Sequence, residues 1–313
     1  VGIYFPELGA EHIFLSNLIA NSIYLILFSG TFLNLKFTFS VSMFKPFLAY
    51  AVPLVFLQLA GVINEMFSRQ SLKYLLPEGF YPELSNAAAL GIFGACFKLS
   101  VFMALAVQAY KFAFEPFFFS HANETNSKQL YASAMNGFII FGGLIWMVIS
   151  LMLPEIAQLV FGADSPYLDG LIIVPVLLGS GFVMGIFYNL SIWYKLTNHT
   201  VIGAFISIFG ALLTIVLNVS LIPTLGFMGS AWASLISWLF MSLLSYFIGK
   251  YYFPMKYKLF KGGFYSIYAA LATAMIVTLD LSLLLRYGLG VGLVSLYLFL
   301  VYWLEIKSIK KKD

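Results

Sequence analysis

Charged residues are scarce in this chain of 313 residues. Asp, Glu, Lys and Arg make up 10% of it, hydrophobic residues make up 61%, and the mean hydropathy is +0.94. A water-soluble domain carries about 25% charged residues, so water alone cannot solvate the surface of this chain. We therefore expect an integral membrane protein, with lipid covering much of the surface.

Groups for redox, metal and nucleotide chemistry are equally few. The chain has a single cysteine, Cys96, in an apolar stretch. One cysteine can form neither an internal disulfide nor a CxxC site. The three histidines, His12, His121 and His199, lie far apart without metal-ligand spacing, and no Walker motif is present. The sequence predicts no enzyme, no cofactor, no metal site and no nucleic-acid partner.

The chain does contain long apolar runs. A helix needs about 20 mostly apolar residues to cross a membrane, and these runs are continuous rather than alternating, which favours helices over a barrel. The predicted fold class is all-α: a polytopic transmembrane bundle of about nine helices. The predicted spans are residues 8–32, 43–67, 86–110, 133–160, 167–194, 201–222, 227–248, 263–284 and 287–304.

The basic residues alternate between the two ends of these spans. Thirteen of the 17 Lys and Arg residues follow odd-numbered spans, Arg69, Lys73 and Arg286 follow even-numbered spans, and Lys98 lies within the third. Because cytoplasmic loops carry the excess of Lys and Arg, we expect an outside N-terminus and a cytoplasmic C-terminus. The chain begins at Val1 without a signal peptide, so we interpret it as a fragment that lacks an odd number of upstream helices.

Several polar residues fall within the second and third predicted spans. A Lys at a helix centre costs about 3 kcal/mol, so Lys98 is either a cationic site for an anionic substrate or half of an ion pair with a carboxylate such as Glu65. Gln58, Glu65 and Arg69 form one stripe at 100° per residue, and the last two are also an i,i+4 pair that could neutralise itself at the interface. We take Lys98, Arg69 and Gln58 as substrate-binding candidates. Glu65 and Pro53, where a kink is expected, are coupling or gating candidates.

Lys111 and Glu115 lie near the cytoplasmic end of the third span. They form either a local i,i+4 pair or an inner gate whose carboxylate exchanges protons with the cavity, and both remain coupling or gating candidates.

Small and amide side chains predict close helix packing. Gly181 and Gly185 in the fifth span, and Ser230 and Ser234 in the seventh, allow helices to approach closely. Asn218 lies deep in the sixth span, where we expect it to hydrogen-bond a neighbouring helix.

Four segments together resemble a known family. They are AVPLVFLQLAGVINEMFSRQSLKYLLP at 51–77, GIFGACFKLSVFMALAVQAYKFAFEPFFF at 91–119, YNLSIWYKLTNHT at 188–200 and LNVSLIPTLGFMGSAWAS at 217–234. In this order they resemble the polysaccharide-transporter (O-antigen flippase-like) branch of the MOP superfamily, which also contains the MATE exporters.

The resemblance implies a MATE-like fold of 14 helices, with two six-helix lobes and two further helices. On that pattern residues 1–35 hold the last helix of the N-terminal lobe, 36–250 form the six-helix C-terminal lobe, and 251–313 add two transmembrane helices and a basic cytoplasmic tail. Five upstream helices of the same protein would then be missing.

The function that the resemblance implies is transport of an undecaprenyl-pyrophosphate-linked oligosaccharide across the bacterial inner membrane, for lipopolysaccharide O-antigen or another surface polysaccharide. Lys98 and Arg69 would attract the pyrophosphate, and Glu65 and Glu115 would be candidates for ion coupling. The implied partners are the lipid-linked oligosaccharide, the bilayer, the missing N-terminal helices and polysaccharide assembly proteins.

Three other functions stay open. A MATE-type drug or cation exporter would need an anionic pocket, whereas Lys98 is the charge placed in mid-membrane. A lipid II flippase of the same superfamily fits equally well. A membrane polysaccharide polymerase or ligase would need acid and base groups in an outer loop, for which only the loop 68–85 with Glu78 and Glu83 offers candidates.

Overall fold

The computed structural model describes residues 11–34, 39–82, 84–122, 124–279 and 281–307. Within these ranges the chain is helical between short connections and contains no strand. The contacts divide the chain into two compact units, Val1–Ala49 and Tyr50–Asp313, and each is described by itself.

The first unit contains α1 (Glu11–Leu27), α2 (Ser29–Leu33) and the beginning of α3 (Val41–Gln70). The single span predicted at 8–32 is therefore broken at Phe28, and residues 8–10 lie outside the described part. Ser29 and Gly30 follow the break, and both are weak helix formers. With 17 residues, α1 is shorter than the roughly 20 residues that cross a bilayer.

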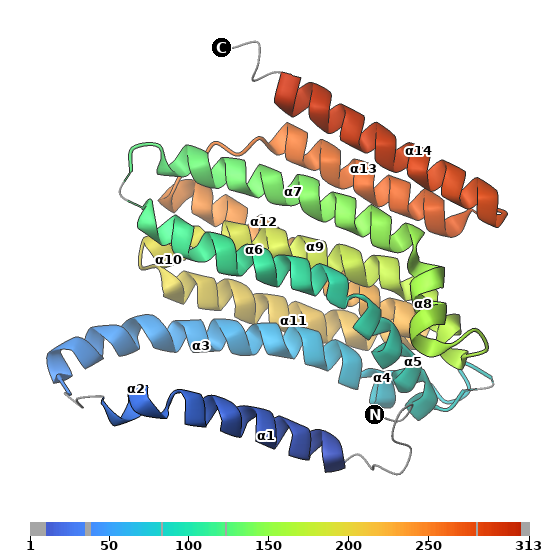
Figure 1. Cartoon of the computed structure of the whole chain (residues 1–313), viewed down its shortest axis with the longest axis horizontal. Helices are drawn as coiled ribbons and strands as arrows, with labels where there is room; N and C mark the ends of the chain where they lie inside the picture. The colour runs from blue at the N-terminus through green and yellow to red at the C-terminus, as the bar shows by residue number, and fades with distance from the viewer. Residues whose placement is uncertain (1–10, 35–38, 83, 123, 280, 308–313) are drawn as a thin grey trace. The chain divides into compact units, whose positions relative to one another are not determined.

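The second unit is a bundle of long helices that run alongside one another, joined by short turns (Figure 1). Its elements after α3 are α4 (Leu72–Leu75), α5 (Asn86–Leu99), α6 (Val101–Ser120), α7 (Ser127–Leu151), α8 (Leu153–Phe161), the 3-10 helix η1 (Pro166–Ile173), α9 (Val174–Leu190), α10 (Ile192–Leu196), α11 (Thr200–Leu225), α12 (Phe227–Tyr252), α13 (Leu259–Thr278), α14 (Leu283–Val301) and the π-helical turn η2 (Tyr302–Ile306).

The described residues form seven helices that are long and apolar enough to cross a membrane. An eighth is added if α5 and α6, which are bent by 43° at their junction, are one span. The chain is thus a polytopic helical bundle, as its composition predicts. The ninth predicted span, 8–32, includes residues outside the described part, and its described residues form α1 and α2 rather than one long helix.

α9 occupies the middle of the second unit and packs against α7 and α12. Glycines on α9 allow this approach: a Cβ atom on Gly185 would collide with the ring of Phe138 on α7. The buried ring of Phe182 stacks on Phe138 with 6.1 Å between ring centroids. Close packing over small residues is how helices associate where lipid removes the hydrophobic force between them.

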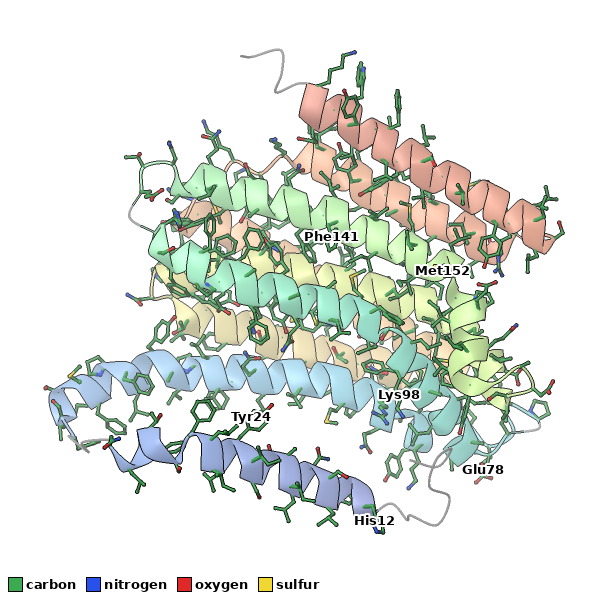
Figure 2. The ribbon with its side chains drawn as sticks, viewed as in Figure 1. His12, Tyr24, Glu78, Lys98, Phe141 and Met152 are labelled. Carbon is green, nitrogen blue, oxygen red and sulfur yellow. The ribbon has the colours of Figure 1, made fainter. Side chains whose placement is uncertain are left out.

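The outward faces of the helices carry large apolar side chains. Phe141 is 59% exposed and Met152 is 45% exposed (Figure 2). Exposed apolar side chains of this kind form the surface that a lipid-facing helix presents.

α6 stops at the end of the second unit where α7, α11 and α13 begin (Figure 1). Contacts connect these helix ends: Lys128 lies 4.6 Å from the ring centre of Phe253, and Lys195 pairs with Glu115. That this end faces the cytoplasm stays a prediction.

Candidate functional site

Arg69 and Lys98, predicted from separate helices, line one cavity of about 290 Å³. Parts of α3, α5, α6, α9 and α12 form its wall. The rest of the lining is uncharged: Phe97, Ser100, Val101, Ala104, Leu177, Ser180, Gly181, Met184, Ser234 and Trp238.

A break in the helical path places Lys98 at this cavity. The backbone N–H and the hydroxyl of Ser100 both donate to the carbonyl of Phe97, at 3.1 and 2.7 Å, and the path bends there. Lys98 therefore lies in the last turn of α5 (Figure 2), not in the middle of the straight span that the sequence predicts. The partial negative charge at the C-terminal end of a helix favours a cation at this position.

Arg69 reaches the same cavity from the C-terminal end of α3. Its guanidinium packs over Gly94 of α5, where a methyl group in place of the glycine hydrogen would lie 3.5 Å from Arg69 Nη2. Gly94 thus offers a flat backbone surface beside the planar guanidinium.

A buried polar network fixes the end of α3 that carries Arg69. The amide of Asn218 donates to the Ser68 hydroxyl at 3.1 Å and to the Thr214 carbonyl at 2.8 Å. The Ser71 hydroxyl donates to Asn218 Oδ1 at 3.4 Å, and Ser230 donates to the Ser68 carbonyl. These bonds join α3 to α11 and α12, and they confirm that Asn218 hydrogen-bonds a neighbouring helix.

The cavity is electropositive. Among the described side chains, neither Arg69 nor Lys98 has an ion-pair partner, and both are exposed to the cavity or its mouth. The predicted partner, Glu65, has a side chain that lies outside the described part of the structure. Two cations in a wall of neutral groups favour an anionic ligand.

The cavity reaches well into the bundle. Trp238 lies about 16 Å along α12 from its first residue, at 1.5 Å per residue, which is about half of the 30 Å hydrocarbon core of a bilayer. One turn before Trp238 on α12, the Ser234 hydroxyl accepts a hydrogen bond from the Ser180 hydroxyl at 3.1 Å. Gly181 and Ser234, which the sequence predicts as packing residues, also line the cavity. Their local sequence pattern does not distinguish helix packing from cavity lining.

The other candidates on α3 do not join this site. Gln58 is exposed and is not part of the cavity lining. α3 continues as one helix through Pro53, which is half-buried. The roles predicted for both residues stay predictions.

Lys111 and Glu115 lie elsewhere on α6. Glu115 is about 21 Å along α6 from its first residue, and its Oε1 lies 2.5 Å from Lys195 Nζ of α10. Lys111 instead lies over the ring of Tyr188, 5.0 Å from its centre. The local Lys111–Glu115 pair is thus replaced by contacts from other helices, which the spacing within one helix does not reveal.

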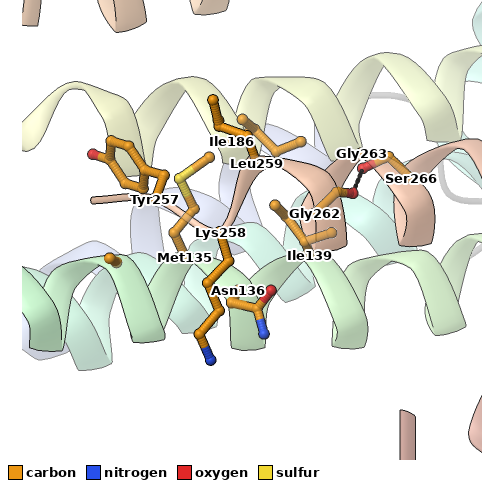
Figure 3. A pocket seen from close by; sticks show the side chains of 11 residues that line it. Met135, Asn136, Ile139, Ile186, Tyr257, Lys258, Leu259, Gly262, Gly263 and Ser266 are labelled. Atoms are coloured by element: carbon orange, nitrogen blue, oxygen red, sulfur yellow. Dashed lines mark hydrogen bonds between the residues drawn. The ribbon is translucent and has the colours of Figure 1, made fainter. Parts of the chain in front are cut away.

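A second cavity lies between α7 and the start of α13 (Figure 3). Its described lining includes none of the residues predicted as site residues from the sequence.

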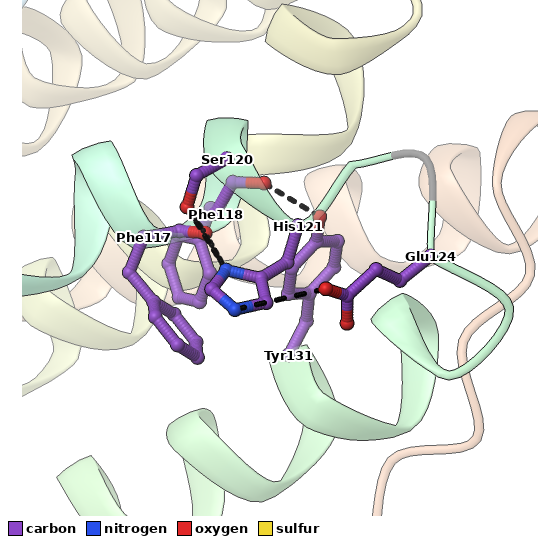
Figure 4. A network of polar contacts seen from close by, with 6 residues as sticks. All are labelled: Phe117, Phe118, Ser120, His121, Glu124 and Tyr131. Atoms are coloured by element: carbon purple, nitrogen blue, oxygen red, sulfur yellow. Dashed lines mark hydrogen bonds and ion pairs between the residues drawn. The ribbon is translucent and has the colours of Figure 1, made fainter.

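The turn after α6 carries a histidine with local contacts (Figure 4). His121 Nδ1 lies 2.9 Å from the Phe117 carbonyl oxygen and 2.9 Å from the Ser120 hydroxyl. Its Nε2 lies 3.9 Å from Glu124 Oε1. These contacts close the C-terminal end of α6, and in the described part of the chain no three His, Cys, Asp or Glu side chains gather as a metal site.

Comparison with known protein families, with curated proteins and with solved structures finds no match for this chain. The family resemblance therefore rests on the four sequence segments alone.

Proposed function

We propose that this chain carries an anionic lipid-linked oligosaccharide across a membrane, and that the Arg69–Lys98 cavity holds its phosphate groups. One observation supports this most: both cations line a single cavity inside a bundle of apolar helices, and no carboxylate among the described residues neutralises them. The substrate class is an undecaprenyl-pyrophosphate-linked oligosaccharide of the bacterial inner membrane, used for surface polysaccharide.

The two cations suit a pyrophosphate for different reasons. The guanidinium of Arg69 can donate two parallel hydrogen bonds to one phosphate, whereas the Lys98 ammonium is a compact charge for the next. The hydroxyls of Ser180 and Ser234 add neutral hydrogen-bonding groups deeper in the cavity. A volume of about 290 Å³ suits a head group of this size, so the sugars would extend beyond it.

Transport of this kind needs no covalent chemistry. The lipid tail stays beside the apolar outer faces, and the head group passes through the polar interior when the cavity opens alternately to either side. The break between α5 and α6 at Ser100, next to Lys98, is where we expect the cavity wall to change shape. Interrupted helices are typical of transporter binding sites.

The alternatives fit the cavity less well or share its chemistry. A drug or cation exporter would need carboxylates where Arg69 and Lys98 lie. A polymerase or ligase would need an acid and a base, and the described cavity lining contains no carboxylate or histidine. A lipid II flippase would use the same pyrophosphate recognition.

The proposal is tested by substitution in the complete protein, with export of lipid-linked glycan as the measurement. Lys98→Ala and Arg69→Ala should each lower export about tenfold to a hundredfold, since each loses a hydrogen bond to a charged group worth about 1.5–3 kcal/mol. Lys98→Glu should abolish it. Lys73→Ala is the matched control, because Lys73 lies near Arg69 in sequence but contacts Tyr74 and does not line the cavity. Normal export by the Lys98 and Arg69 variants, at normal protein levels in the membrane, would exclude the proposed mechanism.

A further inference from the structure

The cavity between α7 and α13 has a volume of about 210 Å³ and combines apolar walls with a few polar groups. Asn136 comes from α7, and Lys258, Gly262 and Ser266 come from the start of α13 (Figure 3). The Lys258 ammonium and the Asn136 amide nitrogen point toward the same side of the cavity. This site is separate from the cavity of Arg69 and Lys98.

Asn136 is a buried polar side chain without a full set of partners. Only 8% of its surface is exposed, and its Oδ1 accepts no hydrogen bond from the described residues. A buried polar atom left without a hydrogen-bond partner destabilises the folded state. A ligand that offers both an acceptor to the amide nitrogen and a hydroxyl donor to Oδ1 would remove this cost.

The first turn of α13 adds unpaired backbone donors. The first hydrogen bond of α13 joins the Gly262 N–H to the Lys258 carbonyl at 2.9 Å. The N–H groups of residues 259 to 261 therefore have no acceptor within the helix, and no side chain caps them. A helix N-terminus of this kind attracts phosphate. A Cβ atom on Gly263 would meet nothing within 4 Å, so the backbone here is open to the cavity.

The charge around Lys258 is positive. Glu305 lies 3.4 Å from Lys258 Nζ and 3.0 Å from Lys261 Nζ. Among the described residues, one carboxylate therefore faces two ammonium groups close to Asn136.

An apolar groove continues from this cavity along α13. It shares Leu259 and Gly263 with the cavity and is otherwise lined by Phe260, Phe264, Ile267, Tyr268 and Leu271. Residues 259 to 271 extend about 18 Å along a helix, slightly more than one leaflet of a 30 Å hydrocarbon core. Phe260 is 90% exposed and Leu271 is 62% exposed. A free phosphate would leave this groove empty, whereas an acyl chain would cover it.

We propose that this cavity and groove bind one anionic glycerophospholipid with a hydroxylated head group, of which phosphatidylglycerol is the simplest. The phosphate accepts hydrogen bonds from Lys258, from the Asn136 amide nitrogen and from the first turn of α13. A head-group hydroxyl donates to Asn136 Oδ1, and one acyl chain lies along α13.

The test is a lipid titration of the purified full chain in detergent, with bound lipid counted by native mass spectrometry. Phosphatidylglycerol and phosphatidylcholine with the same acyl chains are the probes. Lys258→Ala and Asn136→Leu should each weaken phosphatidylglycerol binding about tenfold, as expected for lost hydrogen bonds to a charged group, and should bring it close to the level of phosphatidylcholine binding. Lys256→Ala is the matched control, because Lys256 is exposed and lines neither the cavity nor the groove.

Folding is checked by thermal unfolding without lipid, where Asn136→Leu should be at least as stable as the wild type because it removes an unpaired buried atom. Arg69→Ala should bind phosphatidylglycerol normally, which separates this site from the proposed transport cavity. Unchanged phosphatidylglycerol binding by both site variants would overturn the proposal. Equal binding of the two lipids, or displacement of phosphatidylglycerol by millimolar inorganic phosphate, would overturn it as well.

Discussion

The side-chain amide of Asn218 donates a hydrogen bond to the hydroxyl of Ser68 at 3.1 Å, although 150 residues separate them. The bond attaches the C-terminal end of α3 to α11, and the next residue along α3 is Arg69. Asn218 on α11 thus fixes the position of Arg69, although no described residue of α11 lines the cavity.

Replacing Asn218 should weaken the fold and the site together. Asn218→Leu leaves the hydroxyls of Ser68 and Ser71 buried without this partner, so we expect a loss of about 2 kcal/mol in the free energy of unfolding and a lower rate of glycan export. Thermal unfolding in detergent and an export assay measure the two effects. Ser220→Ala is the control, because the exposed Ser220 hydroxyl bonds only to its own helix at Val216. An Asn218→Leu variant as stable as the control would contradict the positioning role.

Glycan export should depend on the size of the side chain at position 94. A Cβ atom there makes an ordinary 3.5 Å contact with Arg69 Nη2, so Gly94→Ala should export glycan normally. Gly94→Leu would occupy the place of the guanidinium, and its export should fall about as far as that of Arg69→Ala. Equal export by the two Gly94 variants would show that the position of the guanidinium does not matter.

The pair of Glu115 and Lys195 should be measurable as a coupling energy. Lys195 is 15% exposed and Glu115 is 33% exposed, so the pair is partly shielded from solvent. A double-mutant cycle with Glu115→Gln and Lys195→Met should give a coupling of about 1–2 kcal/mol in unfolding free energy. Glu124, whose side chain is 60% exposed, should change stability by less than about 0.5 kcal/mol when replaced by Gln. A coupling near zero would mean that the pair does not join α6 to α10 energetically.

Tyr81 should contribute to a loss of stability at alkaline pH. Its ring stacks on Phe227 with 4.4 Å between centroids, and burial raises the pKa of its phenol above the usual value of 10. A raised pKa in the folded state means that the stability from Tyr81 is complete below pH 10 and is lost as the pH rises through the folded pKa. Unfolding free energies measured from pH 8 to 11 should therefore fall more steeply for the wild type than for Tyr81→Phe. Identical slopes would contradict a partly buried phenol at this place.

Some features of this protein follow from local chemistry and were predictable. The length and polarity of the runs now seen as α7, α11 and α12 identify apolar spanning helices, because the preference of a segment for lipid depends on its own side chains. That Asn218 needs a partner also follows from its place in an apolar run. Composition alone did not reveal the turn at Phe28, which separates α1 from α2 within the predicted span 8–32.

The sequence by itself determined that this chain is a bundle of apolar helices with a few costly polar groups inside it, because scarce charge leaves lipid as the solvent. Only the tertiary structure decided which of those groups meet. Arg69 and Lys98 line one cavity because the turn at Ser100 and the bonds of Asn218 bring two helix ends together. Glu115 pairs with Lys195 rather than Lys111 because α6 packs against α9 and α10 follows α9 directly, and neither contact is encoded by spacing along one helix.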